Sequence, residues 1–149
     1  MKKVGFLKKA VVSVLMSSAF AFSFSAEENG IMSKLTVNLT KIQSEEGEII
    51  VAIYNSSDNY DNGLTFQEHK VKPVNGTVTL ETHLPDGEYL VMLIQDLNMN
   101  GKLDTGFMGI PKEPVGISNY EGKGIPGRFK KHKFSVNGDT EISIPMKYF

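Results

Sequence analysis

The stretch LPDGEYLVMLIQ, residues 84–95, decides the fold class of this chain. Pro85, Asp86 and Gly87 signal a turn, and the residues after them are apolar at both alternate sets of positions. Only a strand covered on both faces hides that much apolar surface. Residues 48–54, EIIVAIY, repeat the two-sided pattern. We therefore expect these two strands to lie at the centres of sheets.

Further strands are indicated on both sides of these two. Residues 34–40 and 77–82 alternate apolar and polar side chains, and a weaker extended stretch covers residues 64–71. Asn75-Gly76 is typical of a hairpin turn. Residues 131–136 and 141–148, joined by Asn137-Gly138-Asp139, are expected to form a last hairpin. Pro145 places the final strand at an edge or a bulge.

Six or seven short strands at spacings of about ten residues, with no convincing helix, predict an all-β fold. We expect an antiparallel two-sheet sandwich, Ig-like or transthyretin-like, with one long Gly/Pro-rich loop. A small closed barrel is the alternative.

The amino end has the features of a cleavable secretory signal peptide. Four lysines among residues 2–9 precede an uncharged run from residue 10 to residue 24, and Ser23 and Ser25 suit cleavage before Ala26. A membrane-anchoring helix is the alternative, but the run is shorter than the roughly 20 apolar residues that a span needs. We expect a leader at 1–25, a polar lead-in at 26–33 and a single domain at 34–149.

The composition of the expected mature chain limits its partners and its location. Removing the four leader lysines leaves twelve basic residues against 17 acidic ones, a formal charge of −5. This acidic balance argues against nucleic acid as a partner. The sequence contains no cysteine, so the chain has no disulfide and no site for a lipoprotein anchor. We expect a periplasmic or secreted monomer whose partner is an envelope protein or a glycan.

Residues 96–104, DLNMNGKLD, have the spacing of a calcium-binding loop. Asp96, Asn98, Asn100 and Asp104 place oxygen-bearing side chains at positions 1, 3, 5 and 9, and the carbonyl of Lys102 fills position 7. The glycine at position 6 permits the sharp turn. These five residues are the predicted Ca²⁺ ligands.

The predicted calcium site lacks one usual ligand. Position 12, normally a glutamate, is Phe107, so we expect weak binding in the range of about 10⁻⁴–10⁻³ M. Glu113 is the nearest downstream acid that can fold back as a further ligand. A plain Asn/Asp/Gly turn and a site for another ion are the alternatives.

Residues 105–130 form an unusually long stretch, rich in glycine and proline. Loops of that length in a compact domain are often functional. The stretch also carries apolar side chains, so we expect it to fold back over one end of the sandwich. It then forms either a ligand-binding surface or a cap over the core.

No residue pattern in the chain indicates an enzyme. The three histidines, His69, His83 and His132, are isolated and are expected on strand surfaces, and Ser118 has no histidine near it in sequence. A non-enzymatic binding or structural module of the cell envelope is the favoured function.

A carbohydrate- or polyanion-binding protein is the alternative. Basic side chains gather between residues 123 and 133, and three aromatic rings are candidates for stacking on sugars: Tyr60, Tyr120 and Phe129.

Three segments together resemble a bacterial family of exported proteins known as domain of unknown function 2141. They are LPDGEY at residues 84–89, the loop at residues 96–104, and GIPKEPVGISN at residues 109–119. Pro114 departs from the family pattern, which usually has glycine there. The resemblance implies export and a common fold but no activity. The P-x-G-x-Y pattern at residues 85–89 is also similar to transthyretin-like and carboxypeptidase-regulatory sandwiches at the level of fold.

Overall fold

A computed structural model describes residues 32–149 except residue 125. The predicted signal peptide therefore lies outside the described residues. Within them, no helix is both long enough and apolar enough to cross a membrane. The elements, in chain order, are β1 (Met32–Ile42), β2 (Glu48–Tyr54), α1 (Ser57–Asp61), β3 (Gln67–Val71), β4 (Gly76–Pro85), β5 (Gly87–Asp96), η1 (Phe107–Gly109), β6 (Val115–Ile117), α2 (Phe129–His132), β7 (Phe134–Val136) and β8 (Thr140–Pro145).

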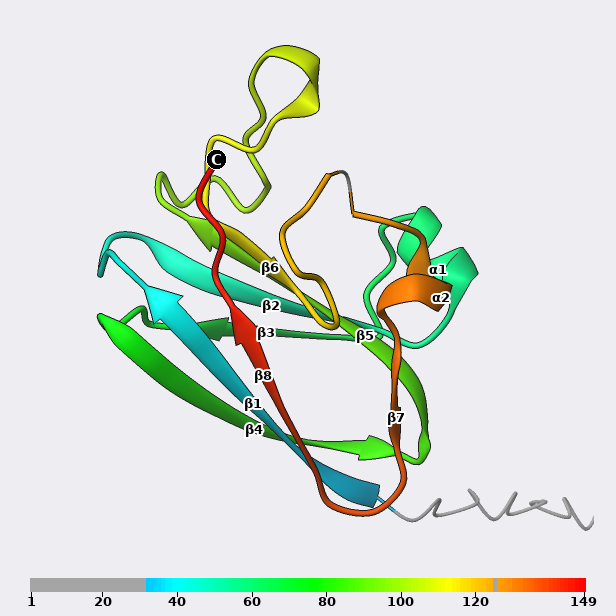
Figure 1. The fold of residues 1–149 in the computed structure, drawn as a ribbon. Coiled ribbons are helices and arrows are strands. Elements are labelled where there is room, and N and C mark those ends of the chain that lie inside the picture. Colours follow the sequence, from blue (N-terminus) through cyan, green and yellow to red (C-terminus); the bar gives the residue numbers. More distant parts are fainter. Residues whose placement is uncertain (1–31, 125) are drawn as a thin grey trace, which may run out of the picture.

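Two sheets pack face to face, as the sequence predicts for an all-β sandwich (Figure 1). The smaller sheet has the order β4-β1-β8, and the larger has the order β3-β2-β5-β6 with β7 pairing β5. The two apolar strands β2 and β5 occupy the interior of the larger sheet, which confirms the prediction from their two-sided pattern. β8 lies at the edge of the smaller sheet and ends at Pro145, where a missing N–H is tolerated.

Both expected hairpins are wrong. β3 and β4 flank Asn75-Gly76, and β7 and β8 flank the turn at Gly138, but the members of each pair lie in different sheets. β8 instead pairs in parallel with β1, so the sandwich is not wholly antiparallel. The reason is that inward-facing apolar side chains of successive strands, such as Val71 of β3 and Leu80 of β4, reach the core from opposite sheets. Burial of these side chains overrides the local turn signal.

The structure has more elements than the sequence predicts. The described residues form eight strands, because three residues inside the expected long loop pair with β5 as β6. The short helix α1 forms where a loop was expected, and α2 takes the end of the expected long loop and residues 131 and 132, so the expectation that a strand begins at residue 131 is wrong. In α1 the Ser56 hydroxyl accepts the N–H of Asn59 at 3.1 Å, a normal N-cap. β1 begins at Met32, within the expected lead-in, and Ser33 is buried.

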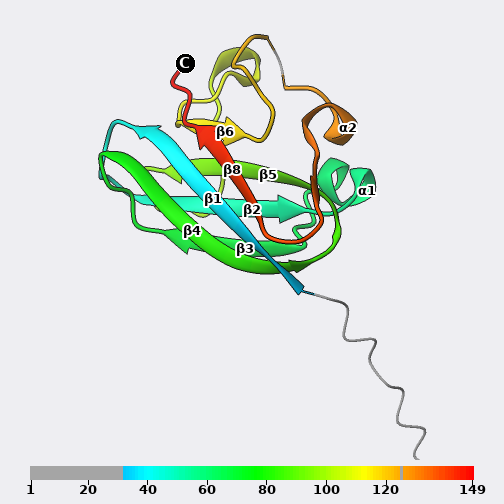
Figure 2. The ribbon, with the colours of Figure 1, turned by 60° about the horizontal axis from the view of Figure 1, so that its bottom comes forward.

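The main core lies between the sheets, and a smaller apolar cluster covers the outer face of the larger sheet. Alternate side chains of β2 and β5 point to opposite faces, so Val51 and Val91 enter the main core while Ala52 and Leu90 enter the outer cluster. Figure 2 shows α1 and α2 together at one end of this outer face. Tyr120 and Phe129 complete the outer cluster.

Candidate functional site: the arm between β5 and β6

The 96–104 loop is anchored where β5 meets the turn between β1 and β2. Asp96 is fully buried at the end of β5. Gly47 lies so close that a Cβ at this position would be 2.0 Å from the carbonyl oxygen of Asp96. Gly47 also has a φ of +70°, so both its conformation and its contact require glycine. The beginning of the loop is therefore held by main-chain packing.

The Asp96 carboxylate organises the loop from inside. One of its oxygens accepts the N–H of Asn100 at 3.1 Å, and the other accepts the N–H of Gly101 at 2.6 Å. Gly101 has a φ of +80°, which supplies the reversal expected at position 6. Asp96, the predicted ligand at position 1, thus accepts hydrogen bonds from main-chain N–H groups on the opposite side of the loop.

The other predicted side chains converge on Asp104. Its Oδ2 accepts the side-chain amide of Asn98 at 2.6 Å and that of Asn100 at 3.0 Å. The amide oxygens of these asparagines accept the N–H groups of Asn100 and Lys102, at 3.1 and 3.0 Å. The structure therefore brings together Asp96, Asn98, Asn100 and Asp104 in one loop.

Glu113 folds back on the loop and joins its two ends. Its Oε1 accepts the N–H of Leu97 and its Oε2 accepts the N–H of Asp104, each at 2.9 Å. The side chain is only 5% exposed. Lys112 adds a main-chain bond to the carbonyl of Asp104 at 2.9 Å. Glu113 is thus a clamp across the loop, and its oxygens each retain a free lone pair.

The donor atoms of the loop suit a hard cation that takes oxygen ligands. Carboxylate and amide oxygens are the ligand types that Ca²⁺ uses. A half-turn of a carboxamide exchanges its nitrogen for its oxygen, so Asn98 and Asn100 can present either atom to the space beside Asp104. Within the described ranges, no three His, Asp or Glu side chains gather as a metal cluster, so any ion here depends on amide and carbonyl oxygens as well.

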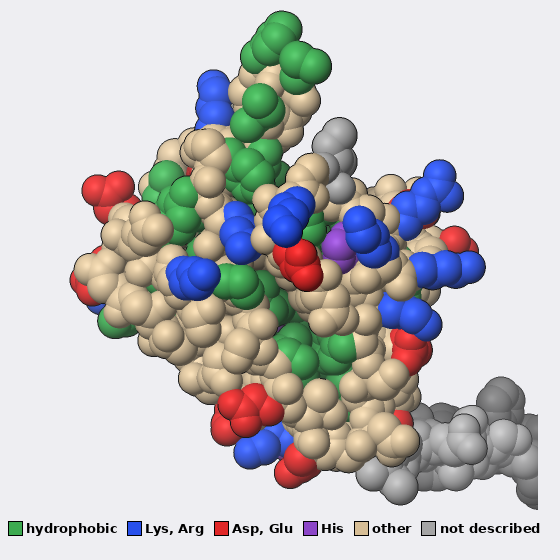
Figure 3. Space-filling view, viewed as in Figure 1, with side chains coloured by type: hydrophobic (Ala, Val, Ile, Leu, Met, Phe, Trp, Pro, Cys, Tyr) green, Lys and Arg blue, Asp and Glu red, His purple; other side chains and the backbone are tan. Residues whose placement is uncertain are grey.

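β6 divides the expected long loop into two arms. The first, or projecting, arm comprises residues 105–114, and the second arm comprises residues 118–130. The second arm caps the core, because Tyr120 and Phe129 are buried over the outer face of the larger sheet. The first arm projects from the body and exposes Phe107 by 87% and Met108 by 84% (Figure 3). The second arm therefore forms the expected cap over the core, and the first arm presents an exposed apolar surface; that the stretch also forms a ligand-binding surface stays a prediction.

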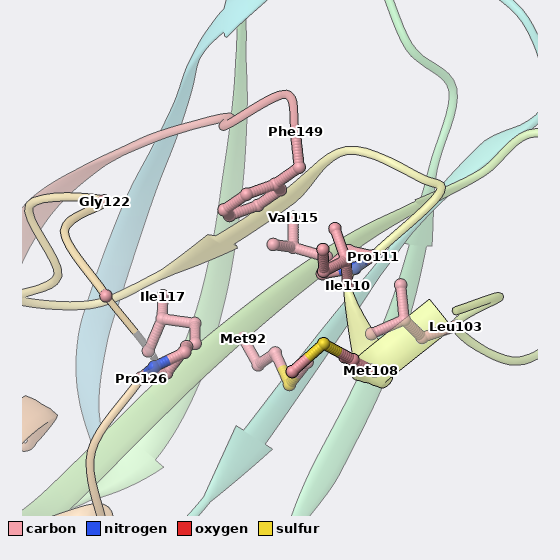
Figure 4. A pocket seen from close by; sticks show the side chains of 12 residues that line it. Met92, Leu103, Met108, Ile110, Pro111, Val115, Ile117, Gly122, Pro126 and Phe149 are labelled. Carbon is pink, nitrogen blue, oxygen red and sulfur yellow. The ribbon is translucent and has the colours of Figure 1, made fainter. Parts of the chain in front are cut away.

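Between the two arms lies an apolar pocket of about 550 Å³. Figure 4 shows its side chains converging from β5, β6, the projecting arm and Phe149. Its lining residues have no charged or hydroxyl side chain; they are Met92, Leu103, Met108, Gly109, Ile110, Pro111, Val115, Ile117, Gly122, Gly124, Pro126 and Phe149. No motif in the sequence predicts this pocket. The one feature of the sequence that points to the pocket is the second apolar face of β5. This face must be covered by other residues, and the two arms cover it only in part.

Ser118 and His132 come close together, but not as a catalytic pair. The Ser118 hydroxyl donates to the main-chain carbonyl of His132 at 2.7 Å and accepts the N–H of Val91 at 3.1 Å. The His132 ring is buried, with Nδ1 3.1 Å from the carbonyl of Asn119 and Nε2 accepting the N–H of Gly127 at 2.9 Å. These contacts fasten the second arm to β5. The expectation that His132 lies on a strand surface is wrong.

The aromatic rings considered for glycan binding are largely covered, whereas Arg128, Lys130 and Lys131 are exposed. Tyr120 and Phe129 are 7% and 5% exposed, so neither offers an open ring for stacking. Lys133, which directly precedes β7, pairs with Glu88 of β5. Burial raises the pKa of Tyr60, whose ring meets that of Tyr54 edge-on at 5.2 Å between centroids.

Comparison with known proteins gives one match. A family model described as "Uncharacterized protein conserved in bacteria (DUF2141)" matches residues 37–144. No curated protein and no solved structure matches the chain, so the similarity to transthyretin-like folds has no structural neighbour.

Proposed function

We propose that this chain, which belongs to the family of uncharacterised bacterial proteins (DUF2141), is a non-enzymatic binding module of the bacterial cell envelope. In this proposal one Ca²⁺ ion occupies the 96–104 loop and stiffens the projecting arm. The supporting observation is the convergence of Asp96, Asn98, Asn100 and Asp104 in a loop whose two ends Glu113 already joins.

The ion would act by neutralising and tightening the loop. Asp96 and Asp104 would supply charged oxygens, Asn98 and Asn100 amide oxygens, and Lys102 its carbonyl. Two carboxylates in the loop give weak affinity, on the order of 10⁻⁴–10⁻³ M, which suits an exported protein exposed to external calcium. Leu103, which lies within the loop, also lines the apolar pocket. Ordering the loop would therefore fix one wall of a binding surface.

Calcium binding is tested on purified protein lacking residues 1–25. Titration calorimetry should give one saturable site, with Mg²⁺ binding more weakly. About 10 mM calcium should stabilise the domain by about 1.4–2.7 kcal/mol over the expected range of dissociation constants.

Asp104→Asn should abolish the calcium effect, because Asp104 is the convergence point of the loop. Asp61→Asn removes one exposed carboxylate in α1 and should leave the calcium effect unchanged. Absence of heat and of stabilisation at 10 mM calcium, or an equal response of both variants, contradicts the proposal.

A further inference from the structure

The apolar pocket is a built cavity on the outer face of β5 and β6. Its floor comes from side chains held by the sheet, since Ile117 is 3% exposed and pairs across to Met92. Its rim comes from more exposed side chains, with Ile110 54% and Phe149 61% exposed. A volume of about 550 Å³ lies within the roughly 300–1,000 Å³ typical of small-molecule sites.

The lining selects for hydrocarbon. A polar ligand placed here would lose its hydrogen bonds to water without finding replacements. Met92 and Met108, which lie near one another in Figure 4, add flexible thioether side chains that adapt to different apolar shapes. The ligand segment inside the pocket is therefore aliphatic.

The rim selects for an anionic head group. Lys147 is not itself a lining residue, but its side chain packs against Gly122, which is one, with its Nζ 3.2 Å from the position of a Cβ on that glycine. Among residues 32–149, residue 125 set aside, four lysines form ion pairs, and Lys147 is not one of them. Figure 3 shows basic side chains around the apolar surface below the projecting arm.

We propose that this pocket binds the hydrocarbon chain of a single-chain anionic amphiphile, such as a fatty acid, with its carboxylate near Lys147. The inference does not depend on calcium, because the floor and Lys147 are positioned by β5, β6 and the strand-like bridge between Val115 and Lys147. It adds a ligand class to the proposed binding function, and either proposal can fail without the other.

The test uses the protein lacking residues 1–25, in chelator, with decanoate and decanol as probes below their aggregation concentrations. Calorimetry should show saturable binding of decanoate. Across a series of fatty acids, each added methylene should tighten binding about fourfold until the pocket is filled. In methyl spectra, Met92 and Met108 should shift, whereas Met32, Met99 and Met146, which do not line the pocket, should not.

Two variants locate the site. Ile110→Asp places a charge in the exposed rim and should weaken both probes at least tenfold. Val74→Asp makes the same change at a 48% exposed site outside the pocket and should leave binding unchanged. Lys147→Gln should weaken decanoate about twofold to fivefold, but not decanol, because only decanoate carries a charge.

Several outcomes would overturn the inference. These are no saturable binding of either probe, equal effects of the Ile110 and Val74 variants, or an unchanged preference for decanoate in Lys147→Gln. Binding to anionic vesicles without binding of monomeric decanoate would also overturn it, and would assign the exposed arm to a membrane surface instead.

Discussion

Replacing Glu113 tests whether a buried carboxylate holds the projecting arm together. Both of its oxygens accept main-chain N–H groups, from Leu97 and Asp104, at 2.9 Å. Glu113→Gln keeps one acceptor oxygen and turns an NH₂ group toward the other donor. Glu113→Ala removes both acceptors and leaves the two N–H groups facing a gap.

The expected loss follows from these two bonds. A hydrogen bond to a charged group contributes about 1.5–3 kcal/mol. Leu97 is 37% exposed, so water partly replaces the lost acceptor there and the lower end of that range applies. We expect the free energy of unfolding to fall by about 2 kcal/mol in Glu113→Gln and by about 3 kcal/mol in Glu113→Ala. At about 4 °C per kcal/mol, the melting temperature should fall by about 8 and 12 °C.

The assay is urea unfolding, followed by circular dichroism, of protein lacking residues 1–25 in excess chelator, so that no bound ion contributes. Glu121→Gln is the matched control, because that side chain is 84% exposed and should give no measurable change. A loss below about 0.5 kcal/mol in both Glu113 variants would refute the clamp. A rise in the hydrogen-exchange rate at Leu97 and Asp104, with the β5 core unaffected, would localise the effect to the arm.

Three further predictions concern other parts of the molecule. Gly47→Ala should lower the free energy of unfolding in urea by about 3 kcal/mol or more, because the new Cβ would meet the carbonyl of Asp96. Gly63 has a similar φ of +67° but open space around it, so Gly63→Ala should cost only about 1 kcal/mol. Equal losses in the two variants would show that the contact with Asp96 is not the cause. Burial raises the pKa of Tyr54, Tyr60 and Tyr89 above the ordinary 10.0. Their contribution to stability is therefore complete below pH 10 and is lost as the pH rises through their folded-state pKa values. An absorbance titration should show that these tyrosines ionise at higher pH than free tyrosine, and a single unshifted step for all five tyrosines of the chain would contradict the prediction. Intact-mass measurement of the protein expressed in a bacterial host should show an amino terminus at Ala26, and retention of residues 1–25 would refute cleavage.

Sequence patterns predict the central strands well because those patterns depend on burial. The two-sided apolar runs of β2 and β5 can be satisfied only in the interior of a sheet, and that is where they lie. Pro145 likewise ends an edge strand for a reason local to its own backbone.

Strand partners are not predictable from turns alone. Asn75-Gly76 favours a hairpin, but β3 and β4 belong to different sheets. A turn fixes only the direction of the next few residues, whereas the choice of sheet is decided by which apolar face each strand must bury. The parallel pairing of β1 with β8 joins residues about a hundred positions apart and leaves no local trace.

The sequence predicts that the four side chains of the loop lie together, while their role as Ca²⁺ ligands stays a prediction, and it does not predict their surroundings. The spacing of Asp96, Asn98, Asn100 and Asp104 forces them into one turn, and the fold brings them together. The clamp by Glu113 and the close contact of Gly47 depend on tertiary packing. The pocket also arises only when residues from five separate segments meet.

The placement of β1 between β4 and β8 affects how the chain reaches its folded state. Until residues 140–145 arrive, one side of β1 presents unpaired N–H and C=O groups beside the apolar Leu35, Val37 and Leu39. Closing so long a loop is entropically costly, so refolding should be slow compared with that of helical domains of similar size. A molecule lacking β8 would expose the unpaired edge of β1, which can pair with a strand of another chain. Incomplete chains are therefore expected to aggregate.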